Sequence, residues 1–188
     1  MTIELMPTSR TLHKIVYPSE QQAHIWKLKQ DNVTTTDLAN ALNTTLAYIS
    51  KVVRVTNKKV KVIIEDIARS NFIELDKVSP EFGFAVGYNH LLNRKAFISY
   101  TIEAGVHVWY EHDGDCSSCP GIEDCLEVID REANERDIQI PETIKSPSHR
   151  ANYVIHEICL RIGWEPEICI HKSEIEEQWA YLYSRMNE

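Results

Sequence analysis

The sequence predicts an α+β fold: a helical head, then a three-stranded antiparallel meander, then helices that pack on the meander. Apolar residues recur at helical spacing before residue 72 and again beyond residue 121. Residues 82–112 are instead rich in aromatic and β-branched residues, with much alternation and two internal turn signals. We therefore expect two domains, which comprise residues 1–78 and 79–188.

The composition is that of an ordinary globular protein. Of the 188 residues, 43% are hydrophobic and 26% are charged. No run of about eighteen apolar residues occurs, so we expect no membrane-spanning helix. The opening MTIELMPTSR lacks an apolar h-region, which argues against a signal peptide. Together with clustered cysteines, these features predict a cytoplasmic protein.

The first helix is expected to begin at Pro18-Ser19-Glu20 and to end at Asp31-Asn32. Serine is a favoured N-cap residue, and asparagine is common where a helix stops. The residues 34–36, all threonine, offer the N-cap of the next helix. Two helices therefore follow each other closely at the start of the head.

Residues 35–54 predict two short helices joined by a tight turn. Leu38, Ala39 and Leu42 share one face of the first of these helices, and Ile49 and Val52 share one face of the second. A small residue at position 39 lets the helices cross closely. Between them lies an asparagine, at position 43, which tolerates the left-handed backbone conformation better than most residues.

This stretch resembles the helix-turn-helix of prokaryotic and archaeal transcription regulators. Ala39, Ile49 and Val52 match the small and apolar positions of that pattern, while Asn43 replaces its usual glycine and Thr44 a common apolar residue. The resemblance implies that the second helix lies in the major groove of double-stranded DNA. Seven residues would then contact DNA: Thr45, Tyr48, Ser50, Lys51, Arg54, Lys58 and Lys59.

The distribution of charge supports this interpretation. The chain carries a formal charge of −8. Its first 72 residues hold ten Lys or Arg and six Asp or Glu, a charge of +4, so the remaining residues carry −12. A basic head on an acidic body suits a nucleic-acid-binding protein.

A further helix is expected over residues 58–69, closed by Ser70-Asn71, with a strand beginning at residues 72–75. A helix that leads into such a strand resembles the entry to the wing of winged-helix regulators. The resemblance therefore predicts a winged-helix head.

Beyond the head, the three strands of the meander are expected within residues 82–90, 95–102 and 106–112. Later helices are expected over residues 122–136, from Ser148 to a stop at Gly163, and from a capping box at residue 173 to about residue 186. These helices would cover the sheet, because three strands need a packed face to be stable.

Three cysteines, Cys116, Cys119 and Cys125, lie within ten residues, with the spacing C-x2-C-x5-C. Two cysteines two residues apart can bend around one metal ion. His112 would complete a zinc site, and is the fourth ligand that we favour. Alternatively Cys159 or Cys169 completes a four-cysteine site for zinc or for an iron–sulfur cluster. A disulfide, or thiols without a ligand role, is the remaining interpretation.

The sequence favours a DNA-binding transcription regulator that carries a metal site in its C-terminal domain and acts as a homodimer, because helix-turn-helix heads usually bind paired half-sites. The chain also loosely resembles archaeal RNA-polymerase-associated factors that join winged helices to zinc or iron–sulfur modules. In such a factor the head would bind polymerase or another transcription factor. An enzyme is the least favoured class, since no acid/base constellation, P-loop or Gly-rich phosphate loop is present.

Overall fold

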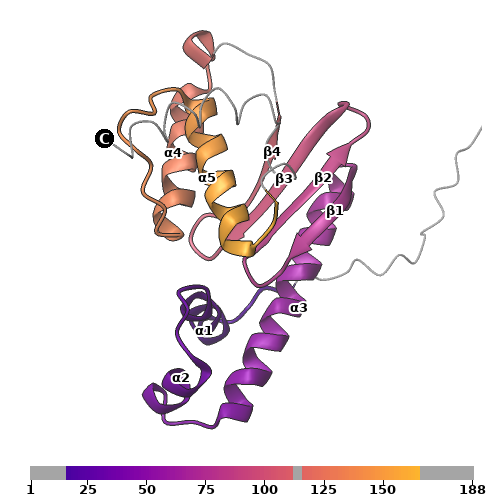
Figure 1. Cartoon of the computed structure of the whole chain (residues 1–188). Helices are drawn as coiled ribbons and strands as arrows, with labels where there is room; N and C mark the ends of the chain where they lie inside the picture. Colours follow the sequence, from indigo (N-terminus) through magenta and orange to yellow (C-terminus); the bar gives the residue numbers. More distant parts are fainter. Residues whose placement is uncertain (1–15, 112–115, 166–188) are drawn as a thin grey trace, which may run out of the picture.

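The computed structural model describes residues 16–111 and 116–165. The fold has three layers (Figure 1): one long helix, a four-stranded sheet, and a pair of helices on the opposite face of the sheet. The elements in chain order are α1 (Glu20–Gln30), α2 (Thr35–Ala41), α3 (Leu46–Ser70), β1 (Ile73–Ser79), β2 (Phe84–Asn89), β3 (Arg94–Thr101), β4 (Gly105–Tyr110), the short 3-10 helix η1 (Cys116–Ser118), α4 (Ile122–Glu135) and α5 (Pro147–Ile162).

Local signals fix the beginnings of the first helices as the sequence predicts. Ser19 caps α1 in a capping box with Gln22, and Thr34 caps α2 by accepting a hydrogen bond from the backbone N–H of Asp37. Helix α1 ends where Asn32 adopts a left-handed conformation.

The sheet is an antiparallel meander in the order β1-β2-β3-β4. The three-strand prediction was therefore wrong by one strand. The strand expected to begin at residues 72–75 is β1, the fourth strand of this sheet, which was assigned to a wing and not to the meander. It is a charged edge strand: Glu74, Asp76 and Lys77 interrupt its apolar pattern, and a bulge shifts its register between Leu75 and Lys77.

The predicted winged-helix head is not found in the described residues. The strand that was expected to enter a wing is β1, which pairs along its length with β2 of the main sheet. Moreover, β1 crosses the predicted boundary at residue 78, so the head and the sheet share a strand. The coarser prediction, a mixed α+β fold with an antiparallel meander, is confirmed.

Helix α3 is one continuous helix of 25 residues. Two separate helices were expected, because Thr56-Asn57 is a weak helix-forming pair. In the structure Thr56 is wholly buried, and its hydroxyl donates to the carbonyl oxygen of Val52 within the helix. The threonine is thus satisfied without interrupting the helix.

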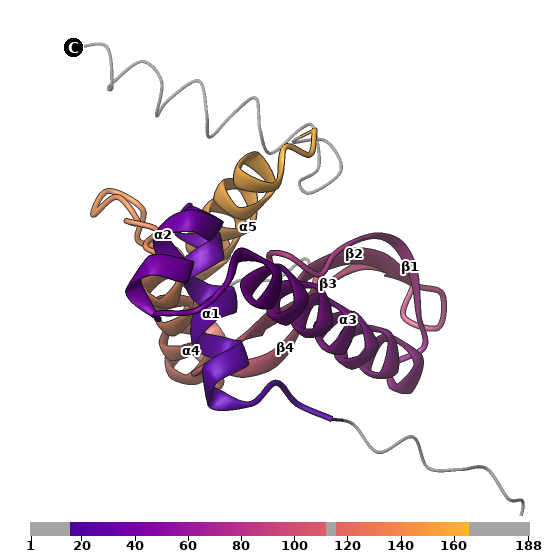
Figure 2. The same ribbon diagram turned by 90° about the horizontal axis from the view of Figure 1, so that it is seen from below.

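The two ends of α3 belong to two different hydrophobic cores. Its first half packs with α1 and α2 through Ile49 and Val52. Its second half packs on one face of the sheet through Val60, Ile63 and Ile64. Helices α1 and α2 and the beginning of α3 form one end of the molecule (Figure 1), which faces the viewer when the molecule is seen from below (Figure 2).

The opposite face of the sheet is covered by α4 and α5. The core there contains Phe84 and Phe97 from the strands, Ile129 from α4, and Val154 and Ile158 from α5. No helix among the described residues is both long and apolar enough to cross a membrane.

Candidate nucleic-acid interface and cysteine cluster

Helices α2 and α3 form a tight helix-turn-helix. Asn43 has φ 47°, the left-handed conformation that its position predicts. Its backbone N–H donates to the carbonyl oxygen of Asn40 at 3.2 Å, and that of Thr44 donates to Ala39 at 2.9 Å. This pair of hydrogen bonds is the Schellman arrangement, which ends α2 and reverses the chain.

A small apolar core holds this head together. It buries Leu38 and Ala39 of α2 against Ile49 of α3. Leu42, which was expected on the same buried face, is 38% exposed because it lies at the C-cap, where the chain leaves the helix.

Three of the seven predicted DNA-contacting residues share the outward face of α3: Lys51, Arg54 and Lys58. Their spacing of three and four residues places them in one row on a helix. All three are exposed, and none of their side chains makes a hydrogen bond or ion pair with any residue that the structure describes. The row is about 10 Å long at 1.5 Å per helical residue.

Two other predicted residues are instead turned toward α1. The Lys59 ammonium donates to Gln22 Oε1 at 2.8 Å, and the Tyr48 hydroxyl donates to Gln21 Oε1 at 3.2 Å. The structure therefore uses these side chains to join α3 to α1, which the sequence pattern did not anticipate.

The remaining two predicted residues lie at the beginning of α3. Thr45 is its N-cap, and its hydroxyl oxygen accepts a hydrogen bond from the backbone N–H of Tyr48 at 3.1 Å. Ser50 is exposed, beside Lys51. The beginning of a recognition helix is the part that contacts base edges in helix-turn-helix complexes.

No acidic residue of α3 interrupts the row Lys51–Arg54–Lys58. Residues 46–64 contain five basic residues and no acidic residue. The first carboxylate along α3 is Glu65, which lies 3.7 Å from the Lys61 ammonium and ends the acid-free run.

The cysteine cluster lies where η1 leads into α4. The backbone N–H of Cys119 donates to the carbonyl oxygen of Cys116, and Cys125 lies in the first part of α4. All three thiols are free. Burial raises the pKa of the Cys125 thiol, and the nearby Cys116 and Cys119 raise it further.

Among the described residues, no group of three or more His, Cys, Asp or Glu side chains is arranged to hold a metal ion. His112, the predicted fourth ligand, lies outside the described residues, as does Cys169. Cys159, the other alternative, is wholly buried in α5 and disulfide-bonded, so its sulfur is engaged away from the cluster.

The sequence did not indicate a buried polar network on α4. Glu132 is 1% exposed and Arg136 is 7% exposed, and both contact Ser99 of β3. They occur in the charged stretch EVIDREANERD, which has the composition of a solvated helix. Only their position on the α4 face that contacts the sheet distinguishes them from their neighbours.

No protein-family model, no curated protein and no solved structure matches this chain.

Proposed function

We propose that this protein is a transcription regulator that binds double-stranded DNA with the outward face of α3. One observation carries the proposal: Lys51, Arg54 and Lys58 form an exposed row on the second helix of a helix-turn-helix, and their side chains have no partner within residues 16–111 and 116–165. Cations that serve stability are normally paired with carboxylates or carbonyl oxygens, as Lys59 is with Gln22 and Tyr17. Unpaired cations in a row instead suit phosphates.

The size of the row sets the expected footprint. Phosphates of one strand follow each other at about 3.4 Å along the axis, so a row of about 10 Å spans roughly three of them. Ser50, next to the row, could then reach base edges as the beginning of α3 enters the major groove.

The test compares the triple variant Lys51→Ala/Arg54→Ala/Lys58→Ala with the parent protein in fluorescence anisotropy on labelled duplex DNA over a range of salt concentrations. Each lost phosphate contact should lower the salt slope by about one, so the variant should lose about three. The matched control is Lys27→Ala/Lys61→Ala/Arg69→Ala, which removes three cations that are ion-paired with Asp31, Glu65 and Asp66.

A triple variant that binds duplex DNA with the parent's affinity and salt slope would refute the proposal. An equal loss of DNA affinity in the triple variant and in the paired-cation control would also refute the proposal. The loss would then reflect the net charge of the protein rather than this face of α3.

A second function, binding to RNA polymerase or another transcription factor, is favoured by apolar exposure around the turn. Leu42 is 38% exposed, Leu46 is 52% exposed and Tyr48 is 38% exposed. Contiguous exposed apolar residues are typical of protein-binding surfaces. Two results together would replace the first function with this second one. The parent protein would not bind duplex DNA, and Leu46→Ser would abolish its co-purification with polymerase.

We also propose that the regulator is a homodimer, because two heads would contact two half-sites of a symmetric operator. Light scattering at micromolar concentration should then return twice the mass of the 21.7 kDa chain. A monomer mass would contradict the dimer and would favour the polymerase-associated function.

For the cysteine cluster we propose one zinc ion held by Cys116, Cys119 and Cys125, with His112 as the fourth ligand. Three free thiols on one turn and the start of α4 support this proposal, and thiolate is a preferred zinc ligand. A bound cation would oppose the raised pKa of Cys125 by favouring its thiolate.

Metal analysis of the purified protein tests this site. Cys119→Ser should abolish stoichiometric zinc, and Cys169→Ser should preserve it. Full occupancy in Cys119→Ser would exclude the site, whereas metal loss in Cys169→Ser with His112→Ala unaffected would indicate four cysteine ligands. A broad absorption band near about 400 nm after anaerobic purification would replace zinc with an iron–sulfur cluster.

A further inference from the structure

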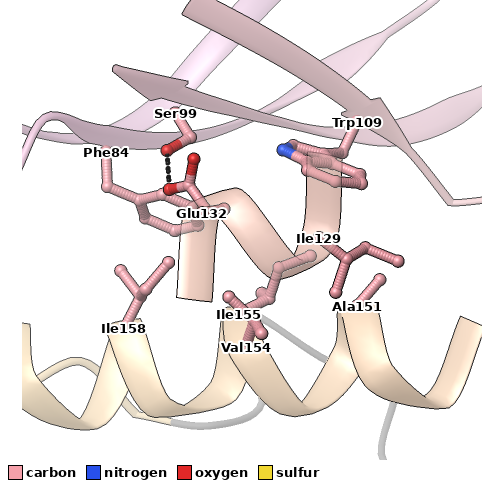
Figure 3. Close-up of a pocket in the computed structure, with 9 residues that line it drawn as sticks. All are labelled: Phe84, Ser99, Trp109, Ile129, Glu132, Ala151, Val154, Ile155 and Ile158. Carbon is pink, nitrogen blue, oxygen red and sulfur yellow. Dashed lines mark hydrogen bonds between the residues drawn. The ribbon is translucent and has the colours of Figure 1, made fainter. Parts of the chain in front are cut away.

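A small enclosed cavity lies between the sheet and the helix pair α4–α5. Its volume is about 10 Å³. Figure 3 shows Phe84 and Trp109 on the sheet side, and Ile129, Val154 and Ile155 on the helices. Two polar side chains, Ser99 and Glu132, also line it.

The two oxygens of the Glu132 carboxylate have different surroundings. Oε1 accepts hydrogen bonds from the Ser99 hydroxyl and from Arg136 Nε, the latter at 2.6 Å. Oε2 is buried and accepts no hydrogen bond from any residue that the structure describes. Because the side chain is only 2% exposed, bulk solvent cannot reach this oxygen either.

Arg136 donates to Oε1 but not to Oε2, and its two terminal nitrogens are directed to other acceptors. Nη1 donates to the Phe82 carbonyl oxygen at 2.8 Å, and Nη2 donates to Ser99 Oγ at 2.9 Å and to the Tyr100 carbonyl oxygen at 3.4 Å. The ion pair neutralises the charge of Glu132 but leaves the hydrogen-bonding capacity of Oε2 unused. A buried acceptor without a donor is strongly disfavoured.

We propose that this cavity binds one internal water molecule, which donates a hydrogen bond to Glu132 Oε2. The volume matches one water, and the neutralised carboxylate calls for a neutral donor rather than a cation. A buried water needs at least two polar partners. Trp109 supplies the second, because its indole nitrogen, which carries a hydrogen, is turned toward the Glu132 side of the cavity (Figure 3).

This water has a specific structural role. Glu132 belongs to α4 and Trp109 to β4, and these two elements flank the segment that carries Cys116 and Cys119. A water bridge between them fixes the angle at which the cysteine-bearing segment leaves the sheet and enters α4. Binding of this water requires neither DNA nor a metal ion.

The direct test is the detection of water next to Trp109 by NMR. Long-lived water should give cross-relaxation peaks to the Trp109 indole proton and to the methyl groups of Ile129 and Ile155 in the parent protein. Absence of these peaks in the parent protein would show a dry apolar cavity and overturn the proposal.

A substitution that fills the cavity gives a second test. The melting temperature should fall if the cavity holds a water molecule and rise if the cavity is dry. Val154→Ile adds one methylene group at the cavity wall. If the methylene group displaces a bound water, Oε2 loses its donor and the melting temperature should fall by about 2–4 °C. A higher melting temperature would mean that a dry cavity had been filled, and would contradict the proposal. Val62→Ile, which makes the same change at an exposed site, is the matched control.

Discussion

The rings of Trp26 and Tyr100 pack against each other with their centroids 5.8 Å apart, which joins α1 to strand β3 across 74 residues of sequence. The Trp26 indole also donates to the carbonyl oxygen of Pro80 at 3.2 Å. Trp26 is 2% exposed. The predicted DNA-contacting head is therefore attached to the sheet by an aromatic contact as well as by α3.

Trp26→Ala should destabilise the protein by about 3–5 kcal/mol, because it empties a large buried site between α1 and the sheet. Trp26→Phe keeps most of the ring and loses mainly the hydrogen bond to Pro80, so it should cost about 1 kcal/mol. Chemical denaturation measures both. Leu91→Ala, at a residue 72% exposed, is the control and should change stability by less than about 0.5 kcal/mol. Equal effects of the two Trp26 variants would contradict the packing argument.

Gly87→Ala should disrupt the pairing of β1 with β2. A Cβ atom at Gly87 would lie 2.3 Å from the backbone oxygen of Glu74, and a backbone atom cannot move away cheaply. We expect a loss of about 1–3 kcal/mol in thermal unfolding, with faster amide exchange in β1. Gly121→Ala is the matched control, because a Cβ atom there meets nothing within 4 Å. If both variants behave alike, the close approach at Gly87 is not a constraint.

Arg136→Met should cost about 3–5 kcal/mol, because it leaves the Glu132 carboxylate buried without its charge partner. Adding Glu132→Gln to this variant should recover part of the loss, since the uncompensated charge is then gone. Denaturant unfolding of the two single variants and the double variant measures the coupling. Additive losses would show that the two side chains do not act as a pair.

The stability should fall as the pH drops below about 6.5, in part because of His156. Burial in α5 lowers the pKa of His156 from its ordinary value of 6.5. The unfolded chain therefore takes up a proton before the folded protein does, and this contribution to stability, fully present above 6.5, is lost as the pH falls toward the folded pKa. The slope from one group is at most about 1.4 kcal/mol per pH unit.

His156→Leu should flatten this pH dependence in urea unfolding measured from pH 7.5 down to pH 5, with both limits approximate and chosen to bracket the ordinary histidine pKa. His149, which is exposed on the same helix, provides the control: His149→Leu should leave the slope unchanged. A slope that persists unchanged in His156→Leu would assign the effect to other groups.

Local backbone chemistry was the most predictable part of the fold. Ser19 and Asn43 have their effect within a few residues, so the sequence around them contains the whole cause. Strand β1 was less predictable, since an edge strand is specified by its partner β2 rather than by its own apolar pattern. The continuity of α3 also depends on burial of Thr56 by distant residues.

The candidate site was predictable to the extent that it depends on helical spacing. Lys51, Arg54 and Lys58 share a face because of helix geometry alone. Lys59 was assigned to the same function because it is next to them in sequence, but it is turned toward Gln22 of α1. The partner lies 37 residues away, and only the packing of α1 against α3 brings the two together.

Because α3 runs without a break through both cores, its geometry fixes the rotation of the head relative to the sheet about the helix axis. Each residue of an α-helix advances the direction of its side chain by about 100°. An insertion of one residue between Lys58 and Val60 would therefore swing the row Lys51–Arg54–Lys58 about a quarter of a turn relative to the sheet, and the helix is too stiff to absorb it. Among related chains, length changes in this stretch should be rare, and those that persist should come as three or four residues, close to a full turn.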